Sequence, residues 1–198
     1  MGVTFQAEGT PIPYEDTYDC GYTTFLAYRI ALASAASPIM GQVYRQVSFG
    51  TFETVAGNRA EIMVFDLSEG PVGAEEILRF ADAHEGVTAS EDTSSLSMTL
   101  DALNAAMHEA YGPDLSSFLC APDTEGRLSP SECAGILADL GRIGPVDIGM
   151  RGHNYGTTEM SVDGDGRRAV QLHEYDMHEQ FVGMFRHCAD SGSTLVWG

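Results

Sequence analysis

The stretch SPSECAGILADL, residues 129–140, contains the clearest local structural signal in the sequence. Ser129 is a favourable N-cap residue and Pro130 suits the first helical position. Glu132 follows the cap by three residues, which completes the pattern of a capping box. Apolar residues then recur at helical spacing, at positions 133, 136, 137 and 140. The stretch therefore predicts an amphipathic helix that begins directly after a turn.

The residues before this helix are similar to a calcium-binding loop of the EF-hand type. With Gly126 as position six of a twelve-residue loop, Asp123, Glu125 and Glu132 fall at positions three, five and twelve. Position one is Ala121, where a carboxylate normally begins the coordination. A capping box and an Asp-x-x-Gly turn explain the same residues without an ion. The sequence thus predicts a degenerate helix-loop-helix in which calcium is a weak ligand, beside a purely structural interpretation.

Further elements can be placed outward from this block. Hydrophobic spacing and cap residues predict helices over residues 21–37, 71–84 and 99–111 and from Asp176 to the glycine at 192. Strands are expected over residues 3–6, 42–52, 59–66 and 194–197. A turn at residues 56–58 predicts a hairpin, and the polar stretch 87–98 predicts an exposed loop. The expected fold is α+β, with several helices packed on a small, mostly antiparallel sheet in one domain of residues 1–198.

Composition limits the function. The chain has 198 residues, of which 43% are hydrophobic and 20% charged, as in ordinary globular domains. Its formal net charge is −19, because 29 acidic residues stand against 10 basic ones, all of them arginine. Such a surface repels phosphate backbones and anionic lipid headgroups, so we expect binding neither to nucleic acid nor to a membrane. The partner we expect is a protein.

The chain also lacks the usual signals for export. Its first residues have neither the basic nor the apolar segment of a signal peptide. The longest apolar stretch, residues 25–40, is too short and too polar to span a bilayer. We therefore expect a cytoplasmic protein, whose four cysteines are reduced thiols.

Catalytic signatures are incomplete. There is no Gly-x-Ser-x-Gly elbow, and the absence of lysine excludes Schiff-base and P-loop chemistry. The remaining candidates for catalysis are His153, Asn154 and His173, which lie with several acids in the irregular region 144–176. A polar surface loop is the alternative interpretation. The favoured hypothesis is a non-catalytic cytoplasmic interaction module, and the second is a small hydrolase or transferase with a His/acid pocket in this region.

The block from Pro122 to Cys133, PDTEGRLSPSEC, resembles a signature found in a group of small bacterial proteins of unknown function. That signature is Ser-Asp-Cys-Asp-Gly-x-Leu-Ser/Thr-Pro-x-Glu-Cys, followed by a helix. The C-terminal residues 175–197 and the start of the chain are also similar to this group, while residues 41–98 lie outside the resemblance. Thr124 stands where the group has cysteine, and Glu125 where it has aspartate. The resemblance implies a fold and no reaction.

Overall fold

The structure is a computed structural model, which describes residues 2–9, 18–56, 61–154, 160–162, 168–170 and 173–198. The fold is α+β, as the sequence predicts, and its contacts divide it into two compact units. Unit 1 comprises residues 1–28, 120–142 and 147–198, and unit 2 comprises residues 29–119 and 143–146. Each unit contains its own four-stranded antiparallel sheet. The prediction of a single domain stays a prediction.

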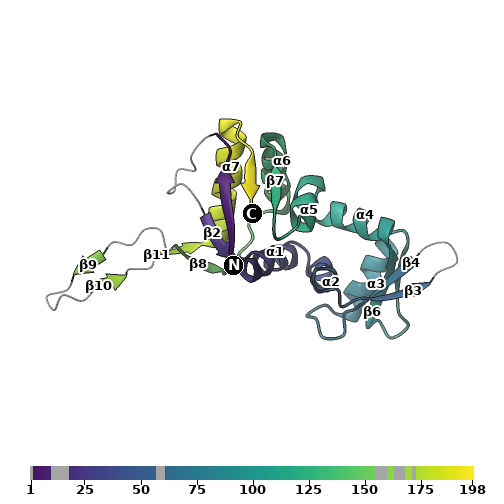
Figure 1. Cartoon of the computed structure of the whole chain (residues 1–198). Helices are drawn as coiled ribbons and strands as arrows, with labels where there is room; N and C mark the ends of the chain where they lie inside the picture. The colour runs from purple at the N-terminus through teal and green to yellow at the C-terminus, as the bar shows by residue number, and fades with distance from the viewer. Residues whose placement is uncertain (1, 10–17, 57–60, 155–159, 163–167, 171–172) are drawn as a thin grey trace. The chain divides into compact units, whose positions relative to one another are not determined.

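The sheet of unit 1 joins the beginning and the end of the chain (Figure 1). Its strand order is β2-β1-β12-β7, and the strands are β1 (Gly2–Ala7), β2 (Tyr18–Gly21), β7 (Gly126–Leu128) and β12 (Leu195–Trp197). The predicted strands near both termini are thus confirmed. The described residues of this unit also form two short antiparallel pairs, β8 (Arg151–Asn154) with β11 (His173–Asp176) and β9 (Met160–Val162) with β10 (Arg168–Val170).

Helices α6 (Pro130–Ile143) and α7 (Met177–Ser191) begin where their capping residues predict. At α7, the Asp176 carboxylate accepts hydrogen bonds from the backbone N–H groups of His178 (2.9 Å) and Glu179 (3.1 Å). Helix α1 (Tyr22–Ala36) contributes its first residues to unit 1. The core of the unit is an aromatic cluster of mutually packed rings, which consists of Phe5, Phe25, Tyr28, Phe181 and Trp197.

The sheet of unit 2 has the strand order β3-β4-β6-β5. Its strands are β3 (Glu53–Ala56), β4 (Glu61–Asp66), β5 (Val87–Ala89) and β6 (Ser95–Thr99). Residues directly opposite in the register lie on the same face, and one face carries the buried side chains of Met63, Phe65, Val87, Leu96 and Met98. Several helices belong to the same part of the chain, namely α2 (Pro38–Phe49), α3 (Ala74–Ala83), α4 (Leu100–Tyr111) and α5 (Pro113–Cys120). Strands β3 and β4 pair as neighbours, so the hairpin prediction holds for its second strand, whereas its first strand is Glu53–Ala56 and not residues 42–52. Residues 57 and 58 of the predicted turn lie outside the described residues.

The predicted strand over residues 42–52 is wrong, because most of it belongs to helix α2. Ser37 caps this helix by accepting a hydrogen bond from Met40 N (3.4 Å), and Pro38 occupies its first turn. Gly50 ends it in a left-handed conformation, with φ of 61°. The β-forming valines and tyrosine of the segment are placed in a helix because residues at helical spacing are buried, namely Ile39, Met40, Val43 and Tyr44.

The predicted exposed loop over residues 87–98 is also wrong, because it forms the hairpin of β5 and β6. Val87, Leu96 and Met98 supply buried side chains, so the hairpin contributes to the core. The polar residues between the strands make the turn. Asp92 accepts hydrogen bonds from the hydroxyls of Ser90 and Ser94 (both 2.7 Å), which lower its pKa to about 2. The serines that suggested a loop are therefore turn residues of a short hairpin.

Candidate functional site

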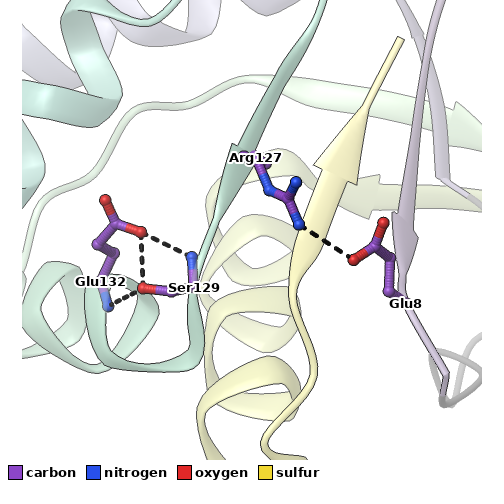
Figure 2. A network of polar contacts seen from close by, with 4 residues as sticks. All are labelled: Glu8, Arg127, Ser129 and Glu132. Carbon is purple, nitrogen blue, oxygen red and sulfur yellow. Dashed lines mark hydrogen bonds and ion pairs between the residues drawn. The ribbon is translucent and has the colours of Figure 1, made fainter.

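The predicted capping box at Ser129 and Glu132 is present and complete (Figure 2). The Glu132 carboxylate accepts hydrogen bonds from Ser129 N (2.7 Å) and Ser129 Oγ (2.6 Å), while Ser129 Oγ accepts one from Glu132 N (3.3 Å). The hydroxyl and then the amide of Ser129 lower the pKa of Glu132, because both bonds favour the charged carboxylate. Glu132, the residue predicted to bind calcium at position twelve of the loop, thus forms the hydrogen bonds that begin helix α6.

Gly126 has a packing role that the sequence does not reveal. It begins strand β7, and a Cβ atom at this position would overlap the indole ring of Trp197 on the neighbouring strand. The indole is held in place by a hydrogen bond from Nε1 to the carbonyl oxygen of Pro122 (3.1 Å). Gly126 is also not among the described residues with positive φ. Glycine is therefore required here for close approach of Trp197, and not for a left-handed turn.

The three predicted metal ligands do not form a ready-made cage. Within the part of the chain that the structure describes, no group of three or more His, Cys, Asp or Glu residues is placed to hold a metal ion. Glu125 is exposed, whereas Asp123 is half-buried and Glu132 holds the cap. The EF-hand character of the loop is not confirmed, and calcium binding by Asp123, Glu125 and Glu132 stays a prediction.

We expect Ser129→Ala to lower the free energy of unfolding by about 1 kcal/mol, because it removes the cap of helix α6. Glu132→Gln tests how much the negative charge of Glu132 contributes to stability. Since the folded-state pKa of Glu132 lies below its ordinary value of 4.5, the carboxylate stabilises the protein above that pH. The stability difference between wild type and Glu132→Gln should then narrow as the pH falls from 7 through about 4. Urea unfolding at several pH values measures both effects.

The matched control is Ser131→Ala, since Ser131 is exposed and its hydroxyl bonds only that of Ser129 (3.0 Å) within the described part of the chain. It should change the unfolding free energy by less than about 0.5 kcal/mol. An equal loss in Ser129→Ala and Ser131→Ala would contradict the cap.

For the predicted catalytic residues, the structure describes the pairing of their backbones and not their side chains. Strands β8 and β11 pair in a register that places Asn154 opposite His173 and His153 opposite Glu174. The side chains of His153, Asn154 and His173 lie outside the described part of the structure. The alternative of a small hydrolase or transferase in the 144–176 region therefore stays a prediction.

A histidine that the sequence analysis did not select lies at the start of helix α7. Nδ1 of His178 is 3.1 Å from the hydroxyl of Tyr28, which is fully buried in the aromatic cluster. Burial lowers the pKa of His178, so at neutral pH the ring is uncharged, and its Nδ1 and the hydroxyl of Tyr28 form a hydrogen bond whose direction depends on the tautomer of the ring. Burial also raises the pKa of Tyr28 far above its usual range, with Asp176 adding to the effect. This pair satisfies a buried hydroxyl and has a structural role.

The exposed large hydrophobic side chains of the described residues all belong to unit 2. They are Phe49, Val55, Leu78 and Leu100, with exposed fractions between 47% and 60%. Val55 lies on β3, an edge strand of the sheet whose four residues are all exposed. An edge strand presents unpaired backbone N–H and C=O groups to solvent. The outer edge of β3 is therefore the candidate binding surface of this unit.

A cavity of about 470 Å³ opens beside the end of helix α2 in the same unit. One wall is a single face of the helix, because positions 42, 45, 46 and 49 follow helical spacing. The other wall comes from the end of β4 and the segment that leads to α3. We name this cavity the α2 pocket, and its lining residues are Gln42, Arg45, Gln46, Phe49, Thr51, Asp66, Glu69, Gly70 and Pro71.

No family model matches this chain, and no curated protein or solved structure matches it either. The resemblance of the Pro122–Cys133 block to a bacterial group therefore stays a prediction. No helix in the described ranges of the chain has the length and apolar character needed to cross a bilayer. What the site adds to the α+β fold is an exposed sheet edge and a polar cavity, both in unit 2.

Proposed function

We propose that this chain is a non-catalytic cytoplasmic interaction module that binds a protein partner through the outer edge of β3. The exposure of this strand carries the proposal. Proteins usually protect an edge strand with lysine, proline or a covering segment, because open edges pair with other chains. The sequence of β3, Glu-Thr-Val-Ala, has no proline, all four of its residues are exposed, and Val55 is 51% exposed.

The charge of the chain indicates the kind of partner. The formal net charge is −19, and exposed Glu53 and Glu61 lie on the two paired strands of this edge. A segment that adds a strand to β3 brings its own side chains next to these carboxylates. Opposite charges across such a contact speed the encounter and exclude wrong partners. The proposed occupant is an extended, basic segment of another protein, bound by strand addition.

Selection from a random-peptide display library tests the proposal, with peptides of about ten residues and the full chain as bait. We expect basic, strand-forming peptides, whose affinities are then measured by isothermal titration calorimetry. Val55→Lys should weaken their binding about tenfold, since it adds a positive charge to the edge. The matched control is Leu78→Lys, which places the same charge on helix α3, where Leu78 is 47% exposed.

Three outcomes would overturn the proposal. The first is a selection without basic peptides, and the second is an equal affinity for wild type and Val55→Lys. The third is self-association at micromolar concentration in analytical ultracentrifugation that Val55→Lys abolishes, because the occupant of the edge would then be a second copy of the chain.

A further inference from the structure

The α2 pocket has a rigid polar frame. The side-chain amide of Gln46 bonds both backbone groups of Asp66, accepting from Asp66 N (2.9 Å) and donating to Asp66 O (2.6 Å). These bonds tie helix α2 to the end of β4. On the other side of the pocket, Gly70 lies so close to the Gln42 amide that any Cβ would overlap it. The walls are therefore held together before any ligand binds, as is usual for small-molecule sites.

The helix wall offers a positively charged hydrogen-bond donor. Gln42 Nε2 is a buried nitrogen that has no hydrogen-bond partner among the described residues. Arg45, one turn further along the same face, is exposed and forms no ion pair within the described part of the chain. The Gln42 nitrogen lies against Gly70 and is closed to a ligand. The exposed guanidinium of Arg45 suits a carboxylate, because guanidinium and carboxylate form paired, charge-assisted hydrogen bonds.

The opposite wall offers acceptors. Asp66 stays ionised at neutral pH, since hydrogen bonds from the hydroxyl and the amide of Ser68 lower its pKa. Glu69 is a second exposed carboxylate on this wall. Two carboxylates suit an ammonium group. Phe49 and Pro71 complete the lining with apolar surface, and Phe49 is 56% exposed.

Neither a simple anion nor a simple cation satisfies both walls. An anion on Arg45 is repelled by Asp66 and Glu69, and by the net charge of −19. A simple cation on the carboxylates is repelled by Arg45 on the facing wall. A ligand that carries both charges pairs with both walls at once.

We propose that the α2 pocket binds a small zwitterion with a free α-carboxylate and a free α-ammonium group. Arg45 holds the carboxylate, Asp66 and Glu69 hold the ammonium, and Phe49 contacts an apolar side chain. Free amino acids and short peptides share this chemistry, and the cavity of about 470 Å³ admits either. This site is independent of strand addition at β3.

Isothermal titration calorimetry of the full chain with L-phenylalanine, phenylalanyl-phenylalanine, phenylalanine methyl ester and N-acetyl-phenylalanine tests the proposal. We expect binding of the amino acid, the dipeptide or both, and the stronger of the two identifies the source. The methyl ester lacks the carboxylate and the N-acetyl form lacks the ammonium, so each should bind about tenfold more weakly. Arg45→Gln should weaken phenylalanine binding about tenfold and leave the affinity for the methyl ester unchanged.

Arg79→Gln is the matched control, because Arg79 is exposed on helix α3, pairs with Glu75 (3.0 Å) and does not line the pocket. Val55→Lys should also leave phenylalanine binding intact, which separates this site from the edge of β3. The proposal is overturned if neither phenylalanine nor the dipeptide binds at about 10 mM. Equal affinities for phenylalanine and both blocked forms, or equal losses in Arg45→Gln and Arg79→Gln, would overturn it too.

Discussion

Phe181→Ala should lower the free energy of unfolding by about 3–5 kcal/mol, because it empties the centre of the aromatic cluster. Phe181 is fully buried and stacks on Tyr28, with ring centroids 4.3 Å apart. It also contacts Phe5 edge-on at 5.2 Å and stacks on Phe25 at 5.7 Å. The neighbouring rings of Phe5, Phe25 and Trp197 also pack on one another, which opposes their collapse into the space. Urea unfolding, followed by the fluorescence of Trp197, measures the loss.

Two further variants make the result interpretable. Domains are commonly stable by only about 5–15 kcal/mol, so Phe181→Ala can unfold the chain, and Phe181→Leu provides a folded variant with a smaller loss. Phe49→Ala is the control, because Phe49 is 56% exposed and its loss should cost less than about 0.5 kcal/mol. A cost below about 1 kcal/mol for Phe181→Ala would show that the cluster is not a tightly packed core.

The same titrations examine the single-domain prediction. Trp197 belongs to unit 1, whereas circular dichroism follows the helices of both units. If the chain unfolds as one cooperative domain, the two signals change at the same urea concentration. Separate transitions would assign the two units independent stability.

Sequence reasoning succeeded where the determinant of structure is local. The capping box at Ser129 and Glu132 and the cap at Asp176 each lie within four residues of the groups they bind. Such contacts are fixed by the backbone of a single turn, so the residue types alone predict them. The starts of the helices after Ser129 and at Asp176 are predictable in this way.

Sequence reasoning failed where distant contacts decide the structure. Residues 42–52 contain β-forming valine and tyrosine, yet Tyr44 is buried in a helix and bonds Leu119 O (2.6 Å), a residue far along the chain. Because a strand was predicted for this segment, the helix face that lines the α2 pocket could not be predicted. With the segment assigned as a helix, the spacing of Gln42, Arg45 and Phe49 indicates one shared face. The opposite wall depends on how the end of β4 packs beside helix α2, and the sequence alone does not predict that contact.

Strand β3 shows a second limit. Its sequence suits a strand at the edge or at the centre of a sheet, and only the pairing order reveals that it is an edge. The candidate surface thus follows from topology, whereas the predicted ion loop followed from residue types. In the predicted ion loop, the key residue Glu132 instead caps the start of helix α6.

Gly126→Ala distinguishes the two explanations of that loop. If Gly126 is needed for close packing, the new methyl group displaces the indole of Trp197, and the unfolding free energy should fall by about 2–3 kcal/mol. The ring has little room to move, because it stacks on Phe5 at 5.9 Å and bonds Pro122 O. The fluorescence of Trp197, the sole tryptophan of the chain, should change in the folded state as well.

The control is Gly141→Ala, an exposed position of helix α6 where a Cβ atom meets nothing within 4 Å, and the protein should gain about 0.5–1 kcal/mol. Calcium titration of the chelator-treated wild type and Gly126→Ala completes the comparison. A stable Gly126→Ala with unchanged fluorescence and a lost calcium heat would favour an ion loop. A destabilised variant, beside a wild type that gives no heat at tens of micromolar calcium, assigns the glycine to Trp197 and the acids to the helix start.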